Sequence, residues 1–242
     1  MSVDPFFNDR ATIAVFERAF YAGREAAEEV EAILGWRPRP RRILDVGCNA
    51  GLHALEWARR GVEVVGIDSA PVAIALARQR AAGDPRLRFE VADLADADLA
   101  RLGRFDLVAA LGGVFNCIPR PALAPAFRAV RGVLEPGGAF VFDVLRWLDA
   151  PRKVFLRRDG QGALKIVWEF TLDPVAGRGR VLGHFLDTGA IQDSERNFFT
   201  APEVTGLLAS AGLAVDAVAG DLAFTVPAAA AEPSLFFRAR PA

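Results

Sequence analysis

Two aspartates and two glycines are the residues of this sequence best placed to act together on a ligand. Asp45 lies in a short apolar segment, Arg42–Val46, which is followed by Gly47 and Gly51. Apolar residues then recur at helical spacing, so the pattern predicts a strand, a glycine turn and a helix. Because glycine has no side chain, the backbone of such a turn can approach a ligand closely, at the N-terminus of the helix.

A second acidic residue follows one strand–helix unit later. The apolar segment 62–68 predicts another strand and ends at Asp68. In nucleotide-binding α/β folds an acidic residue at this place binds ribose hydroxyls. Ser69, next to it, is predicted to cap a helix over 70–82. We expect the carboxylates of Asp45 and Asp68 to reach the same crevice.

The spacing of the glycines separates two classes of ligand. A dinucleotide-binding turn reads G-x-G-x-x-G, whereas residues 47–51 read Gly-Cys-Asn-Ala-Gly. Asp45, two residues before the first glycine, would also repel a pyrophosphate and attract a cationic amino-acid group. The turn therefore disfavours a nicotinamide-dependent oxidoreductase, the rival enzyme on a similar sheet.

This stretch resembles the first motif of the class I S-adenosylmethionine-dependent methyltransferases, which reads hydrophobic-D-x-G-C-G-x-G. Asp45, Gly47, Cys48 and Gly51 match it, and Asn49 stands where the family usually has glycine. Asparagine tolerates a positive φ better than most residues, so the turn can survive. The resemblance implies methyl transfer from S-adenosylmethionine to a nitrogen or oxygen of a small molecule. It also implies a Rossmann-like, doubly wound α/β fold with a seven-stranded, mostly parallel sheet.

The resemblance assigns roles along the cofactor. Asp45 and the glycines would shape the methionine end, Asp68 would bind ribose, and Asp93 would bind the adenine amino group. Tyr21, on an N-terminal helix, would close over the cofactor. The complete predicted cofactor set is Tyr21, Asp45, Gly47, Cys48, Asn49, Gly51, Asp68, Ser69, Asp93, Leu94 and Leu111.

The methyl acceptor has to lose a proton, and a general base would help that step. His184 alternates with apolar residues on a predicted strand, Asp143 lies near the exit of the fifth strand, and Asn116 follows a glycine-rich loop. We take these three as the catalytic candidates, although a loop asparagine commonly serves its turn. His53, in the helix after the glycine turn, is expected to pack or to be solvated. No cluster of His, Cys or carboxylates has ligand spacing, so no metal is expected.

The chain reads as one domain in four parts. Strands alternate with helices through a cofactor-binding core, which predicts a parallel sheet, and a turn at Glu135–Gly138 precedes the fifth strand. Three segments without intervening helices, 153–157, 164–172 and 180–187, then predict antiparallel strands. The expected parts are an N-terminal helical lid over 1–38, the core over 41–145, a substrate-covering antiparallel β insertion after the fifth strand over 152–199, and a C-terminal helix with the last two strands over 200–242.

Composition limits the partners. The chain has 242 residues, 52% of them hydrophobic, with a formal net charge of −1. A near-neutral balance gives no basic field for nucleic acid or for anionic lipid, and no apolar run is long enough to span a membrane. The two cysteines and an N-terminus without signal-peptide features fit a reducing cytoplasm. Two other functions stay open: a methyltransferase that acts on protein or RNA, and a non-catalytic partner or sensor that only binds the cofactor.

Overall fold

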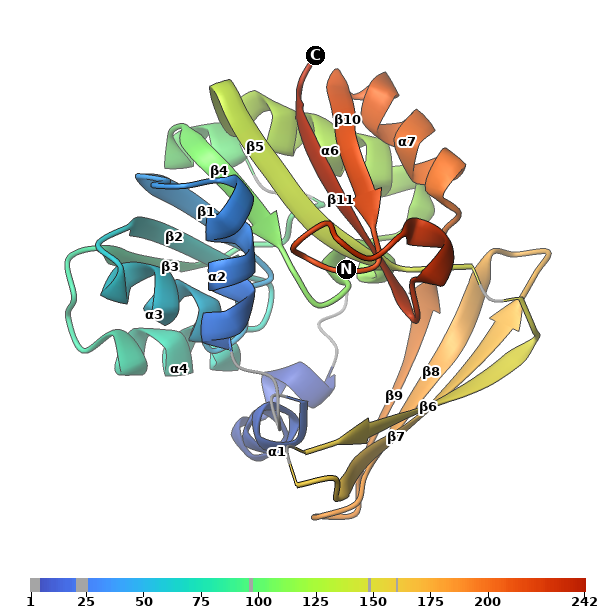
Figure 1. Cartoon of the computed structure of the whole chain (residues 1–242). Helices are drawn as coiled ribbons and strands as arrows, with labels where there is room; N and C mark the ends of the chain where they lie inside the picture. The colour runs from blue at the N-terminus through green and yellow to red at the C-terminus, as the bar shows by residue number, and fades with distance from the viewer. Residues whose placement is uncertain (1–4, 21–25, 96–97, 148, 160) are drawn as a thin grey trace.

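A computed structural model of the chain describes residues 5–20, 26–95, 98–147, 149–159 and 161–242. Two β-sheets organise them: a seven-stranded sheet flanked by helices and a curved four-stranded sheet beside it (Figure 1). A short helical segment at the N-terminus lies between the two. No helix in the described ranges is both long and apolar enough to cross a membrane.

The seven-stranded sheet is doubly wound, as predicted. The strands from β5 to β3 run parallel, and β11 is antiparallel to both of its neighbours. The sheet is therefore mostly parallel, with a single reversed strand inserted near one edge. In spatial order its strands are β10 (Leu213–Ala219), β11 (Ser234–Pro241), β5 (Leu134–Leu145), β4 (Phe105–Ala110), β1 (Arg42–Val46), β2 (Glu63–Asp68) and β3 (Leu87–Val91).

Helices cover both faces of this sheet, because its central strands are apolar on both sides. In β1, Leu44 packs into one buried cluster with Phe127, whereas Ile43 packs into the other with Trp57. One face is covered by α2 (Ala26–Trp36), α3 (Leu52–Arg59) and α4 (Pro71–Ala81), and the other by η2 (Leu99–Leu102), α6 (Arg120–Val133) and α7 (Ala201–Ser210). The remaining short helices are α5 (Val114–Cys117) and η3 (Ala228–Ala230).

The four-stranded sheet is wholly antiparallel and contains one strand more than the sequence predicts. Its order is β6 (Arg152–Arg158), β7 (Leu164–Asp173), β8 (Arg178–Phe185) and β9 (Ala190–Asn197). The prediction of three strands missed β9 because it carries polar side chains on both faces. Gln192, Ser194 and Arg196 occupy the face on which β7 and β8 present apolar residues, so the usual apolar alternation is absent.

Cross-strand register divides this sheet into two faces. Trp168 lies opposite Gly183, and Phe170 lies opposite Val181, on the face that we call the inner face. A Cβ atom on Gly183 would come within 2.4 Å of the Trp168 ring, so only glycine lets that ring lie flat across β8. His184 is on the other face, because successive residues of a strand point to opposite sides.

The N-terminal segment packs on the inner face. It consists of η1 (Pro5–Asn8) and α1 (Arg10–Phe20). The ring of Phe6 stacks on that of Phe185, with centroids 5.3 Å apart and an interplanar angle of 22°. Phe16 also contacts Phe185, and the buried cluster includes Ile166. The N-terminal segment and the four-stranded sheet thus form one layer, which stands opposite the seven-stranded sheet (Figure 1).

Two local predictions are wrong. The turn expected at Glu135–Gly138 belongs to β5, where a register shift against β4 accommodates the extra residues and Gly137 takes a φ of +78°. Ser69 does not cap α4, whose N-cap is Ala70. The carboxylate of Asp68 accepts the backbone N–H of Ala70 instead, at 2.9 Å, because the strand ends with that side chain turned toward the helix.

Candidate active site

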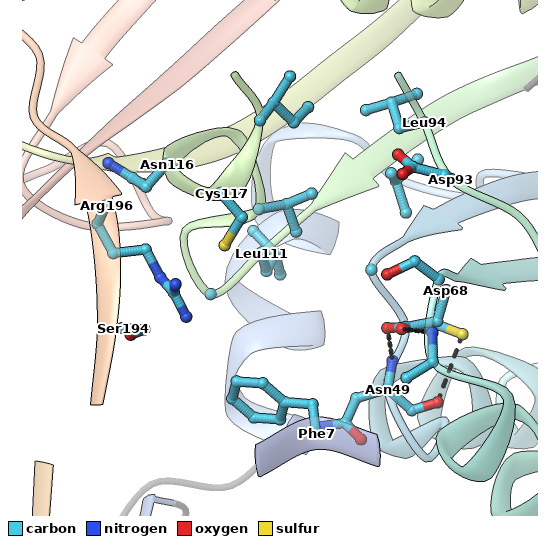
Figure 2. A pocket seen from close by; sticks show the side chains of 18 of the residues that line it. Phe7, Asn49, Asp68, Asp93, Leu94, Leu111, Asn116, Cys117, Ser194 and Arg196 are labelled. Carbon is cyan, nitrogen blue, oxygen red and sulfur yellow. Dashed lines mark hydrogen bonds between the residues drawn. The ribbon is translucent and has the colours of Figure 1, made fainter. Parts of the chain in front are cut away.

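A cavity of about 650 Å³ lies at the carboxyl ends of the parallel strands, between that edge and the four-stranded sheet. This is the place where open α/β sheets bind ligands, and the volume is that of a small-molecule site. Figure 2 shows the loops after β1 to β4 on one side of the cavity and β9 on the other. Residues from both parts of the chain line it, among them Phe7, Phe16, Asp45, Asn49, His53, Asp68, Asp93, Leu111, Asn116, Cys117, Ser194 and Arg196.

The glycine turn is held against the end of β2. The backbone N–H groups of Gly47 and Cys48 both donate to the carbonyl of Ile67, at 2.8 and 3.0 Å. Gly47 has a φ of +71°, and a Cβ there would lie 2.5 Å from Val114. Asn49 adopts a φ of +48°, so asparagine occupies the left-handed region that the family's glycine would fill.

Asp68 connects that turn to the next helix. One carboxylate oxygen accepts the backbone N–H of Asn49 at 2.9 Å, and the other accepts that of Ala70. Burial raises the pKa of Asp68, and the hydrogen bonds from Ala70, Asn49 and Ser69 partly oppose that rise. The residue therefore shapes the turn and lines the cavity at the same time (Figure 2).

Asp45 is buried without a complete set of partners. It is 4% exposed, and its Oδ2 has no hydrogen-bond partner among the described residues. The pKa of Asp45 is raised from an ordinary 3.8 to about 6; burial is the main cause, His53 acts to lower the pKa, and the negative charge of Asp68 acts to raise it. An unpaired carboxylate in such a place is costly unless a cation or donor meets it. The site therefore fits a cationic group.

The other predicted cofactor residues also come together. Ser69, Asp93, Leu94 and Leu111 all line the cavity, with the glycine turn. Asp93 additionally accepts the backbone N–H of Ala95 at 2.9 Å, so it organises its own turn. Cys48 is buried, and burial raises the pKa of its thiol well above the ordinary value. Tyr21 lies outside the described residues.

Asp143 and Asn116 brace the loop after β4. One oxygen of Asp143 accepts the backbone N–H groups of Gly112 and Gly113, at 2.7 and 3.1 Å. The Asn116 amide donates to the carbonyl of Asn197 at 2.6 Å, and its oxygen accepts the N–H of Leu145 at 3.0 Å. Asn116 lines the cavity, whereas Asp143 lies behind the loop. Their catalytic roles stay predictions.

His184 is not among the lining residues. It lies on the outer face of the four-stranded sheet, opposite Val167 and Ile191, with Nε2 3.8 Å from the carboxylate of Glu169. Its proposed contact with the acceptor thus has no support in the strand register.

Several lining residues were not predicted. Phe7 and Phe16 reach the cavity because the N-terminal segment packs on the four-stranded sheet, and Ser194 reaches it because β9 exists. Arg196 lines the cavity from β9, whereas Arg146 donates to the carbonyls of Ala229 and Ala231. The adjacent phenylalanines Phe6 and Phe7 were the sequence signal from which a contribution of the N-terminal segment to the cavity could have been predicted.

The described residues contain no group of side chains suited to bind a metal ion. No group of three or more His, Cys, Asp or Glu side chains there could hold an ion. That the reaction is metal-free remains a prediction.

Known proteins match the cofactor side of the molecule best. Residues 43–138 match the family described as a methyltransferase domain. A ubiquinone biosynthesis O-methyltransferase of Alkalilimnicola ehrlichii is 41% identical over 112 residues, which cover 43% of this chain and 42% of that protein. A magnesium-protoporphyrin O-methyltransferase of Rhodobacter capsulatus is 43% identical over 29% of this chain and 31% of its own. The chain thus spans less than half the length of these curated relatives.

Solved structures match over the whole chain, including the four-stranded sheet. The CcbJ methyltransferase from Streptomyces caelestis superposes with a TM-score of 0.76 at 20% identity and covers 100% of both chains. An S-adenosylmethionine-bound amino pentose methyltransferase from Micromonospora echinaspora gives 0.67 at 26% identity over 90% of each chain. The strand order, the glycine turn between two aspartates and these likenesses agree. Residues 43–138 therefore resemble a methyltransferase domain, and the fold of the chain is the one found in S-adenosylmethionine-dependent methyltransferase structures.

Proposed function

We propose that this protein transfers a methyl group from S-adenosylmethionine to an amine nitrogen of a small molecule. The observation that carries the proposal is the two-sided cavity. Buried carboxylates at the strand ends face it from one side, and aromatic and polar side chains of the N-terminal segment and β9 face it from the other. The cofactor, when bound, supplies a methyl group already activated by a sulfonium.

The cofactor side has groups for each part of that molecule. Asp45 would pair with the methionine ammonium, which would satisfy its unpartnered Oδ2. Asn49 Oδ1, also buried and without a partner among the described residues, would accept a second donor. Asp68 would bind ribose, and Asp93 the adenine amino group beside Leu94 and Leu111.

The acceptor would lie toward Phe7, Phe16, Cys117, Ser194 and Arg196, which line the far side of the cavity. Positioning of two reactants can supply on the order of 7–11 kcal/mol of a barrier. The aromatic rings of the N-terminal segment and the polar side chains of β9 would hold the acceptor in line with the methyl group. They would also keep water from competing.

Nitrogen is favoured over oxygen because a neutral amine needs no base to attack. A hydroxyl does need one, and on β9 the lining carboxylates Asp193 and Glu195 are paired with Arg180 and Arg178. The amino pentose methyltransferase resembles this chain across the acceptor side as well. The O-methyltransferase relatives support a hydroxyl acceptor as the second candidate, but they match only 29–43% of the chain.

Calorimetry and turnover would test the proposal in two steps. S-adenosylhomocysteine should bind and NADH should not. Release of S-adenosylhomocysteine should then be measured with matched panels of small amines and alcohols. Turnover with amines, rising with pH as the amine loses its proton, would support the proposal. Cofactor binding without turnover on either panel would favour a sensor, and turnover on alcohols alone would favour O-methylation.

Three further properties stay proposals of the same kind. They are the single-domain division with residues 152–199 covering the acceptor, a cytoplasmic location, and a lack of nucleic-acid or membrane partners. Each rests on the sequence arguments given above.

A further inference from the structure

One buried histidine–glutamate pair beside the cavity has no part in the reaction described so far. His53 Nε2 lies 2.6 Å from Glu29 Oε2, with the histidine side chain 13% exposed and the glutamate side chain 7% exposed. Glu29 comes from α2 and His53 from α3. Burying two charged groups costs more solvation than a generic helix–helix contact requires. A carboxylate at hydrogen-bond distance also favours the imidazolium form of the ring.

His53 is placed on the same side of the cavity as Asp45. It is the second residue of α3, directly after the glycine turn, and it lines the cavity. Its charge reaches Asp45 strongly enough to act on that carboxylate. Gly51, the N-cap of α3, supplies no side-chain cap, so the first-turn N–H groups add a partial positive charge at this place.

The charges of the methionine end indicate which group of the cofactor His53 would bind. The methionine end of the cofactor is a zwitterion, and Asp45 accounts only for its ammonium. The other basic side chains that line the described cavity, Arg120, Arg178 and Arg196, come from α6 and the four-stranded sheet. Arg120 is paired with Glu203, and Arg178 with Glu195. Among the described lining residues, His53 is the basic side chain on the cofactor side.

We propose that His53 binds the carboxylate of the cofactor's methionine end, with Glu29 holding the ring in place and charged. The proposal rests on the proposed function. It makes the pair Asp45 and His53 a receptor for a free α-amino acid group, with one residue for each charge. In this arrangement the buried carboxylate of Glu29 would link α2 to the first turn of α3.

The test compares S-adenosylmethionine with its decarboxylated form, which keeps the ammonium and loses only the carboxylate. Calorimetry on the wild-type chain should show a preference of about 10- to 100-fold for the carboxylate-bearing ligand, as expected for one charge-assisted hydrogen bond. In His53→Gln this preference should fall about tenfold, with affinity for the decarboxylated ligand nearly unchanged. Glu29→Gln should reduce the preference by a smaller factor.

The pH dependence of this ligand preference distinguishes binding by His53 from a purely structural role of the residue. The preference should decline as the pH rises and His53 loses its proton. Asp45, Asp68, Cys48 and the Glu17–Arg80 pair also surround this end of the cavity, but their titration affects both ligands and cancels in the ratio. His184→Gln is the matched control, since the other histidine of the chain is on the outer face.

The possible outcomes distinguish a failure of the His53 proposal from a failure of the proposed function. Equal losses for both ligands in His53→Gln, or a wild-type chain that does not discriminate, would overturn the role of His53 and leave the methyltransferase proposal standing. Binding of neither ligand to the wild type would instead contradict the proposed function. Should His53→Gln melt below assay temperature, the wild-type preference and its pH profile, with Glu29→Gln, still decide.

Discussion

The two sides of the cavity are built in different ways. On the cofactor side, Asp45, the glycine turn, Asp68 and Asp93 lie at or directly after the ends of parallel strands, and backbone N–H groups fix the carboxylates of Asp68 and Asp93. On the acceptor side, the walls come from η1, α1 and β9, which meet only through tertiary packing. The first kind of site is set by local geometry. The second depends on how distant segments pack, which leaves it free to differ between proteins with the same cofactor.

The largest effect expected is on the cofactor side, at Asp45. Asp45→Asn should weaken S-adenosylmethionine binding by at least about 100-fold, because the ligand's ammonium would be buried without its counter-charge. The unliganded variant should nevertheless be more stable at pH 7, by up to roughly 3 kcal/mol, since the wild-type carboxylate is ionised there despite a raised pKa.

The sign of that stability change can be checked by pH. A carboxyl with a raised folded-state pKa stabilises the protein at low pH and loses that contribution as the pH rises through about 6. The advantage of Asp45→Asn in thermal melts should therefore shrink between pH 6 and pH 4. A variant less stable than wild type at pH 7 would show that Asp45 has an unrecognised partner.

Asp68 should come next. Asp68→Asn should lower cofactor affinity about 10- to 100-fold, the cost of charged hydrogen bonds to ribose hydroxyls. Asparagine preserves one acceptor for the N–H of Asn49 or Ala70, so it perturbs the turn less than alanine would. Calorimetry would measure the cofactor affinity of the variant, and circular dichroism would check that it is folded. An unchanged dissociation constant would remove Asp68 from the site.

Acidification should weaken cofactor binding in the wild type. Below about pH 6 the Asp45 carboxyl becomes protonated, and each further unit should cost roughly tenfold in affinity. At pH 5 the loss is therefore about tenfold. Flat affinity between pH 7 and pH 5 would mean that Asp45 does not meet the ammonium. The same titration in Asp45→Asn should lack this component.

On the acceptor side, Gly183→Ala should act without touching the cofactor. The added Cβ would lie 2.4 Å from the Trp168 ring and displace it, and with it the packing of Phe185. We expect the KM for the acceptor to rise several-fold, with cofactor affinity within twofold. Gly189→Ala is an informative partner variant, because a Cβ there meets nothing within 4 Å, although its φ of +70° adds backbone strain. If Gly183→Ala weakened cofactor binding as much as it raised the KM for the acceptor, the two sides of the cavity would not be independent.

The smallest effect should be that of His184→Ala. On the outer face, this residue faces neither ligand, so kcat and KM should stay within about twofold of wild type. A tenfold drop in kcat, in a variant that melts normally, would return His184 to the catalytic candidates.

The comparison also explains what the sequence predicts and what it does not. Asp45, Asp68 and Asp93 could be placed because each ends a strand, and parallel strands end at one edge of a sheet. The face of His184 could not, since a pairing shift of one residue would reverse it. β9 was missed because Gln192 and Ser194 are polar on the side that faces the protein interior. Of these two, Ser194 lines the cavity, so the strand that borders the cavity lacks the apolar alternation by which strands are recognised.

The two cysteines offer a consequence for experiment. Cys48 is buried in the glycine turn with a pKa held well above its ordinary value, whereas Cys117 is exposed and lines the cavity near the acceptor side. Thiolates react and thiols do not, so reactivity follows pKa and access. A thiol-directed fluorophore should label the native protein at Cys117 alone. The unmodified chain therefore carries its own attachment point for a reporter, from which occupancy of the acceptor side could be followed in real time.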